Sequence, residues 1–307
     1  MIDQASRSVS DNTARGILLA LIATLVFSTQ DATSKFLVAS VSPFQMTMMR
    51  FWAFAALSLF LVWRQGPLRE AFRSRQPWTQ ITRGLLLVVD IWMFVLALRT
   101  VPLDAVQGIT LVYPLLVTLV AIPLLGERVG LFRIGAVATG LVGALVIVRP
   151  GGVPLDWGVA FAVGSGSCYA IYIVLTRRVS ATDSASTSMF YVGMVGLVVS
   201  STVGIFFWQP LDLQSALLIG YIMLTGCVAH GLMILALSMA PASVLQPFSY
   251  TALPWALAFS YFVFHELIDP ISLLGAAIVV AAGLVVMARE RLKSVPAKID
   301  AAPPGKE

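Results

Sequence analysis

Apolar residues dominate this chain in long, nearly unbroken runs that are separated by short polar segments. Each run is about 18–22 residues long, and a helix of about 20 residues crosses the ~30 Å hydrocarbon layer of a bilayer. The pattern therefore predicts an all-α integral membrane protein with ten transmembrane helices. We place them approximately at residues 16–37, 43–63, 81–99, 104–125, 131–148, 156–176, 186–207, 215–236, 242–264 and 271–288.

Composition and charge agree with this interpretation. Of the 307 residues, 58% are hydrophobic and 11% are charged, whereas a soluble domain has about 25% charged residues. The net charge of +5 does not indicate nucleic-acid binding, because 16 of the 20 Lys and Arg residues fall on one side of the predicted topology. By the positive-inside rule, both termini are expected in the cytoplasm. The segment before the first span, 1–14, is expected to be a disordered cytoplasmic tail.

The chain contains an internal repeat. Five residues of one stretch recur 139 positions later: Ala97, Leu98, Pro102, Gln107 and Glu127 as Ala236, Leu237, Pro241, Gln246 and Glu266. A long fixed period indicates a duplicated architecture. We divide the chain into a tail at 1–14, two five-helix repeats at 15–150 and 151–290, and a cytoplasmic tail at 291–307. Because five is odd, the second repeat is expected to be inverted in the membrane, as in many secondary transporters.

A proline recurs with the repeat, one residue out of step, as Pro114 in the fourth span and Pro254 in the ninth. Proline removes a backbone donor and bends a helix. We expect both spans to kink towards a central cavity and to leave carbonyl groups exposed there.

Four ionisable residues fall inside predicted spans: Asp31, Lys35, Arg50 and Asp90. A charge inside the bilayer costs about 2.5–3.5 kcal/mol on insertion scales, so it marks a function or a compensating partner. Asp31 and Lys35 are four residues apart, where an acid and a base can pair on one helical face. Asp31, Lys35 and Arg50 are expected to form a structural ion network, or else an outer gate or a contact for a charged substrate group.

Asp90 lies near the middle of the third span and has no base beside it in its own helix. It shares a helical face with Phe94 and Ala97. One hypothesis is that Asp90 binds and releases a proton during transport, so that protons act as the coupling ion. The alternative is a hydrogen-bonded structural acid.

Aromatic and polar residues at mid-depth indicate the lining of a cavity. The candidates, beside Asp90 and Phe94, are Tyr113, Tyr169, Tyr172, His230, Gln246, Tyr250 and Trp255. Aromatic walls with few polar groups suit a flat or amphipathic small molecule. Any one of these side chains could equally be a packing residue, so the prediction rests on the set.

Motifs for enzymatic chemistry do not occur in the sequence. It has no GxxxxGK[ST] motif for ATP hydrolysis and no HExxH, and its two histidines, His230 and His265, are far apart. We therefore expect a protein that is not an enzyme and that needs no cofactor, metal or nucleic acid. Its expected partners are the lipid bilayer and a small-molecule substrate, and it is either a monomer or a homodimer.

The ten-span plan, the polar end of the first span, Arg50, Tyr113-Pro114 and Gly126-Glu127 resemble the EamA family of the drug/metabolite transporter superfamily. The resemblance implies a secondary, alternating-access carrier in the bacterial inner membrane. Export of amino acids or related amphipathic compounds is the first hypothesis that it suggests. Import of riboflavin or S-adenosylmethionine-like metabolites is the second. A channel, a lipid scramblase and an intramembrane hydrolase are alternatives of other classes.

Overall fold

A computed structural model describes residues 2–66, 71–125, 130–148, 156–240, 245–267 and 269–294, and these residues are almost entirely helical. The α-helices are α1 (Ile2–Leu37), α2 (Pro43–Gln65), α4 (Pro77–Ala97), α5 (Leu103–Thr110), α6 (Tyr113–Leu125), α7 (Leu131–Ile147), α8 (Trp157–Ser180), α9 (Ala185–Gly204), α10 (Leu213–Met239), α12 (Ala252–Phe262) and α13 (Pro270–Ser294). Two short 3₁₀-helices, η1 (Ile205–Phe207) and η2 (Gln246–Thr251), join them. Following the predicted topology, we call the end of the bundle where α1 begins the inner end and the opposite end the outer end.

Local sequence determines where several helices begin. The side chains of Asp156, Ser184 and Asp212 accept hydrogen bonds from backbone N–H groups in the first turns of α8, α9 and α10. Ser42 does the same for α2, and Pro43 follows it in the first turn. These side chains satisfy N–H groups that have no partner within a helix, so each polar connector also starts the next apolar helix.

Eight helical segments of the described chain are long and apolar enough to cross a membrane, and they coincide with eight of the ten predicted spans. The other two predicted spans correspond to shorter helices. The predicted span 131–148 contains the 17-residue helix α7, and the predicted span 242–264 contains η2 and the 11-residue helix α12. The disorder predicted for the N-terminal tail is wrong, because α1 already begins at Ile2. Extending an existing helix avoids the cost of nucleating a new one, which explains why this polar segment continues the helix.

The fourth and ninth predicted spans are both interrupted. The fourth consists of α5 and α6, with Leu111 and Val112 in a turn directly before Tyr113 and Pro114. The described part of the ninth contains the 3₁₀-helix η2 and becomes α-helical at Ala252. The interruption therefore precedes the repeated proline in both spans.

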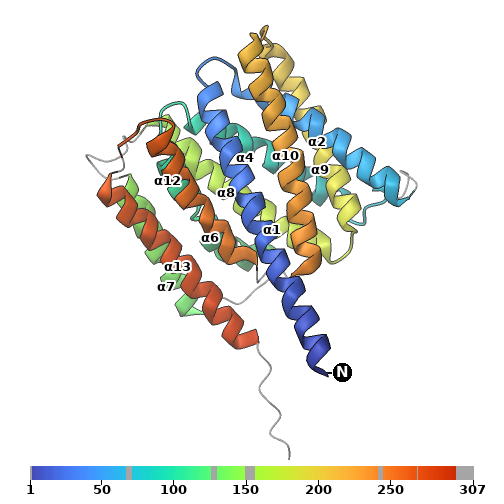
Figure 1. The fold of residues 1–307 in the computed structure, drawn as a ribbon, viewed down its shortest axis with the longest axis vertical. Coiled ribbons are helices and arrows are strands. Elements are labelled where there is room, and N and C mark those ends of the chain that lie inside the picture. The colour runs from blue at the N-terminus through green and yellow to red at the C-terminus, as the bar shows by residue number, and fades with distance from the viewer. Residues whose placement is uncertain are drawn as a thin grey trace, which may run out of the picture.

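The two halves of the chain pack through corresponding pairs of helices (Figure 1). Helix α1 lies along α10, and its counterpart α8 lies along α4. The two second helices, α2 and α9, pack against each other, as do the two last helices, α7 and α13. Each pair is antiparallel, as Phe44 against Phe207 and Trp52 against Ser201 show for α2 and α9. Exchanging the halves therefore leaves the main helix pairs unchanged.

Helices α7 and α13 form one edge of the bundle and approach each other closely (Figure 1). A Cβ atom on Gly143 would lie 2.7 Å from the Gly275 carbonyl oxygen, and one on Gly275 would lie 2.6 Å from the Gly143 carbonyl oxygen. Only glycine allows this separation, which is the means by which small residues bring membrane helices together.

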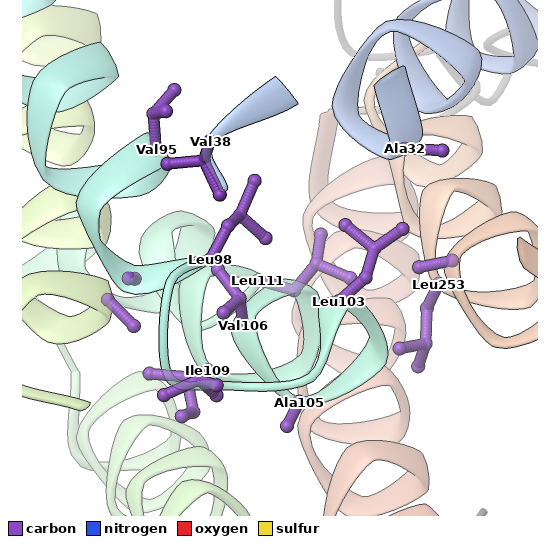
Figure 2. Packing of buried hydrophobic residues seen from close by; sticks show 14 of the residues in the cluster. Ala32, Val38, Val95, Leu98, Leu103, Ala105, Val106, Ile109, Leu111 and Leu253 are labelled. Atoms are coloured by element: carbon purple, nitrogen blue, oxygen red, sulfur yellow. The ribbon is translucent and has the colours of Figure 1, made fainter. Parts of the chain in front are cut away.

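The largest buried apolar cluster surrounds α5 in the middle of the bundle (Figure 2). Leu103, Val106 and Ile109 of α5 are each at most 3% exposed. They pack with the ends of α1 and α4 from the first half and with Leu253 of α12 from the second half. This core joins the two halves next to the interrupted helices.

Candidate functional site

Three of the four predicted membrane charges meet between α1, α2 and α4. The guanidinium of Arg50 on α2 interacts electrostatically with Asp31 on α1 and with Asp90 on α4. Its direct partner is Gln30, which is fully buried. With the Gln30 amide oxygen turned towards the guanidinium, the orientation that satisfies both groups, Arg50 Nε donates to it at 2.9 Å, and Nη2 on the same edge donates as well. The three charges all come from the first half of the chain.

The second half supplies neutral polar groups to the same place. Ser165 on α8, which is 2% exposed, donates a hydrogen bond of 2.6 Å to the Asp90 carboxylate. This bond crosses from one repeat to the other. It gives Asp90 the partner that is absent from its own helix, so both a proton-binding role and a structural role are compatible with its geometry.

A cavity of about 40 Å³ lies beside this charged group. Arg50 and Phe54 of α2, Leu87 of α4, and Cys227 and His230 of α10 are among its lining residues. One buried water needs about 10–15 Å³, whereas drug-sized ligands occupy pockets of about 300–1,000 Å³. The cavity therefore has room for a few water molecules but not for a metabolite in this conformation, and binding a metabolite requires the helices to separate.

His230 faces this cavity with its ring held on both sides. Its Nδ1 lies 2.8 Å from the Gly226 carbonyl oxygen, and its ring contacts Phe27 and Phe54 at centroid distances of 5.1 and 4.9 Å. The predicted histidine thus belongs to the same site as Arg50.

Three of the predicted tyrosines form a continuous row. The Tyr172 ring stacks on Tyr169 at 5.7 Å, and Tyr169 meets Tyr113 edge-on at 4.8 Å. The Tyr113 hydroxyl donates to Ser249 Oγ at 3.4 Å, which joins the interrupted fourth and ninth spans. At the inner end of the row, the Arg83 guanidinium lies 5.5 Å from the Tyr172 ring centre. The row therefore runs from the inner half of the bundle to the helix interruptions.

The remaining predicted residues lie elsewhere. Phe94 packs against the central apolar cluster, and Tyr250 is buried, with a hydroxyl that has no partner among the described residues. Pro254 and Trp255 are on the exposed face of α12, and Trp255 is 39% exposed. Gln246 begins η2, but its side chain lies outside the described residues.

Lys35 is separated from the other membrane charges. Its ammonium forms an ion pair with Glu266 at 2.6 Å at the outer end of the bundle and lies 5.2 Å from the Phe264 ring centre. The predicted pairing of Lys35 with Asp31 is therefore wrong. The two are close in sequence, but Glu266 offers Lys35 a partner across the repeats, while Asp31 interacts with Arg50.

A second contact adjoins this outer ion pair. The Ser260 hydroxyl of α12 donates to the Asp104 carboxylate at 3.1 Å and accepts from the Asp104 backbone N–H at 3.2 Å. The backbone N–H of Glu266 donates to the Ser260 carbonyl at 2.9 Å. The outer end is thus closed by contacts between α1 and α5 of the first half and the α12 end of the second.

Two further polar clusters join connectors at opposite ends of the bundle. In the inner cluster, Asp183 of the α8–α9 turn accepts from Ser74, from Gln80 Nε2 at 2.9 Å and from the Arg75 backbone N–H at 2.9 Å. Burial works to raise the pKa of Asp183, but these hydrogen bonds outweigh it, so the pKa lies below its usual value.

The outer cluster is built from amides. Gln45 Nε2 donates to the Gln209 carbonyl at 2.9 Å, and the Gln209 backbone N–H donates to Gln45 Oε1 at 3.2 Å. The Gln209 side chain also donates to the Ser40 carbonyl at 2.9 Å. Both clusters join the turn after the first helix of one repeat to the connector after the second helix of the other.

Sequence reasoning missed several of these residues. Gln30, Ser165 and Gln45 are neutral and lie in long helices, so nothing in their sequence context distinguishes them from packing residues. Arg83 is one of the Lys and Arg residues that the sequence analysis uses only to orient the helices, yet it is 2% exposed and donates to the Ser188 carbonyl at 2.6 Å. Glu266 was noted only as a repeat of Glu127, which lies outside the described residues.

The comparisons with known proteins agree with this architecture. A family model described as the EamA-like transporter family matches residues 14–149 and again residues 156–288. The chain belongs to the EamA-like transporter family. The two matches correspond to the two predicted repeats and show that the family domain occurs twice.

Named relatives of this EamA transporter are distant but cover nearly the whole chain. An S-adenosylmethionine uptake transporter of Rickettsia prowazekii (strain Madrid E) is 24% identical over 284 residues, which are 92% of this chain and 95% of the relative. A riboflavin transporter of Vibrio cholerae serotype O1 is 28% identical over 280 residues, which are 89% of this chain and 93% of the relative. A solved crystal structure that is 18% identical has a TM-score of 0.62 and covers 93% of this chain and 99% of the other, which shows a shared fold.

Proposed function

We propose that this EamA-family transporter is a secondary-active carrier that imports a small amphipathic metabolite with a flat ring system. The observation that carries the proposal is that the charged group of Arg50, Asp31 and Asp90 adjoins the aromatic row, because Asp90 interacts electrostatically with Tyr169 of that row. S-adenosylmethionine and riboflavin, the molecules named for the relatives, each contain a flat heteroaromatic ring. Such rings stack well on aromatic side chains. Export of amino acids, the first hypothesis from the sequence, has no specific support among these relatives.

The proposed architecture is ten transmembrane helices in two inverted repeats, with both termini in the cytoplasm. The eight candidate spans, the two shorter apolar helices and the corresponding antiparallel pairs of helices support it. The excess of Lys and Arg in alternate connectors supports the orientation. The bacterial relatives support a location in the inner membrane.

The proposed mechanism is alternating access. The site is accessible to water-sized molecules only, and the outer end is closed by the Lys35–Glu266 ion pair, which we propose acts as an outer gate. The interrupted spans before Pro114 and Pro254 provide places where the two repeats can bend relative to each other. In the proposed cycle, inward and outward openings expose the Arg50 site in turn.

Protons are the proposed coupling ion, with Asp90 as the group that carries them. Its carboxylate contacts Ser165 of the other repeat, so a movement of the repeats changes its hydrogen bonding. A carboxyl group whose partners change between two conformations can take up a proton on one side and release it on the other.

Uptake into proteoliposomes tests the function. We expect saturable uptake and counter-exchange for S-adenosylmethionine or riboflavin and no comparable exchange for amino acids. Exchange of amino acids alone would favour the export hypothesis. Flux that neither saturates nor counter-exchanges would indicate a channel, and transbilayer movement of labelled lipid would indicate a scramblase.

A further inference from the structure

Helix α1 carries an unusual density of polar side chains, most of which are satisfied within the helix. Four hydroxyls donate to the carbonyl oxygen four residues earlier: those of Thr24, Ser28, Thr33 and Ser34. Gln30 differs from them, because its amide reaches across to α2, where it meets Arg50. Gly226 of α10, on the opposite side, lies against the same amide.

The partner that Arg50 selects is unexpected. With the amide in this orientation, its Nε and Nη2 groups, which share one edge of the guanidinium, donate to the neutral Gln30 oxygen, whereas Asp31 and Asp90 act on it at longer range. Among the described side chains, neither carboxylate makes a direct ion pair with it. A guanidinium bonds more strongly to a carboxylate than to an amide. Something must therefore hold the cation away from the two acids, and Gln30 is the side chain that contacts it.

We propose that Gln30 is a positioning residue that fixes the Arg50 guanidinium at the cavity without an ion pair that would neutralise its charge. By satisfying the N–H groups with a neutral oxygen, Gln30 keeps Arg50 from collapsing onto Asp31 or Asp90. The cavity then presents a cation to an incoming ligand, and both acids remain free to act separately. The functional meaning of this arrangement rests on the carrier function proposed above, but the arrangement itself can be tested without a substrate.

Cys227 provides a reporter, because its thiol lies on the wall of the same cavity as Arg50. The probes are iodoacetate and iodoacetamide, which have similar sizes but differ in charge. Their ratio of alkylation rates reports the electrostatic potential at the thiol. The thiol's own reactivity cancels in this ratio. Full-length protein carrying Cys168→Ala has Cys227 as its single cysteine.

The decisive variant is Gln30→Met, which keeps the length and approximate volume of the side chain and removes the acceptor. Released from Gln30, Arg50 should pair with a carboxylate, and the iodoacetate-to-iodoacetamide ratio should fall about five- to tenfold, the size expected when a nearby charge is cancelled. Ser28→Ala, which removes another buried polar group of α1, is the matched control and should leave the ratio unchanged.

An unchanged ratio in Gln30→Met would overturn the proposal, because Gln30 would then only fill space. If Gln30→Met does not fold, Gln30→Asn, whose amide is one methylene shorter, replaces it and should lower the ratio by a smaller factor. Here too, a ratio equal to that of the parent would overturn the proposal. A lowered ratio with unchanged uptake would confirm the positioning role and count against the proposed carrier site instead.

Discussion

The two halves of this chain share an architecture but differ in chemistry. In the first half, α1, α2 and α4 carry Asp31, Lys35, Arg50 and Asp90 inside the membrane region. In the second half, the corresponding helices carry no Asp, Glu, Lys or Arg across residues 157–176, 185–204 and 213–239. The second half instead contributes Ser165, His230 and the glycine beside Gln30. Duplication thus preserves the helix pairing, while the charged groups have been placed on one side of the interface only.

This difference indicates how a pseudo-symmetric carrier can hold one asymmetric ligand. Two copies of a charged half would bury about twice as many ionisable groups, each costing about 2.5–3.5 kcal/mol on insertion scales. One charged half facing a neutral, hydrogen-bonding half avoids that cost. It also makes the site asymmetric, so that an asymmetric ligand can bind in one orientation. The comparison predicts that substitutions in the first half affect transport most.

The largest effect is expected at Arg50. Arg50→Gln removes the cation between two acids and should lower the initial uptake rate at least about 100-fold, since breaking a buried charge cluster costs about 3–5 kcal/mol. Arg64→Gln, at the exposed end of the same helix, is the matched control and should transport like the parent. Uptake in proteoliposomes measures both. Near-normal uptake by Arg50→Gln would contradict the prediction that transport depends most on the charged residues of the first half.

The next effect is expected at the outer ion pair, which joins the two halves. Lys35→Met should lower uptake about tenfold, because it leaves the half-buried Glu266 without its partner and weakens outer closure. Glu266→Gln should have a similar effect.

The double variant Lys35→Glu/Glu266→Lys restores opposite charges and is expected to recover part of the activity. A double variant no better than the single ones would show that the pair does more than close the gate. If both single variants transport normally, the pair is a structural contact and the outer gate lies elsewhere.

Asp90 is expected to show a smaller and more specific effect. Asp90→Asn keeps the shape of the side chain and removes its titration, so it should retain counter-exchange. It should lose the acceleration, several-fold in the parent, that an imposed pH gradient produces. Ser165→Ala in the second half removes the hydrogen bond to Asp90 but not the acid, so its response to the gradient should remain. A response in Asp90→Asn equal to that of the parent would exclude Asp90 as the coupling group.

The sequence predicted the helices better than the contacts between them. Hydropathy located the spans because each apolar run has to be long enough to cross the bilayer, and caps such as Asp156 and Asp212 explain several helix starts. Arg50 and Asp90 stood out because charge is rare inside spans. The partners of these residues could not be predicted, since they depend on helix packing. Sequence spacing favoured Asp31 for Lys35, while the fold provided Glu266.

The same limit applies to neutral residues. Nothing in the sequence around Gln30 or Ser165 separates them from other polar residues of their helices, and only the fold shows that both contact the charged group. The break in the fourth span was predictable because Pro114 cannot donate a helical hydrogen bond. The 3₁₀ geometry of η2 was not predictable, because it occurs before Pro254 and depends on how the two halves pack.

The smallest predicted effect concerns stability and compares the polar clusters at the two ends. Asp183 accepts three hydrogen bonds in the inner cluster, and its pKa in the folded protein lies below the unfolded value of about 3.9. A lowered carboxyl pKa stabilises the fold above the unfolded pKa, and this stabilisation is lost as the pH falls through the folded pKa. Asp183→Asn should therefore lower the Tm of the purified protein by a few degrees between pH 5 and 8, and the deficit should shrink below about pH 4.

Gln45→Leu removes the equivalent contact in the outer cluster, where both partners are amides, so its Tm deficit should not depend on pH in this way. Thermal unfolding of both variants across this pH range makes the comparison, and a deficit for Asp183→Asn that does not shrink at all as the pH falls from 5 to 3 would show that the inner cluster depends on shape rather than on charge.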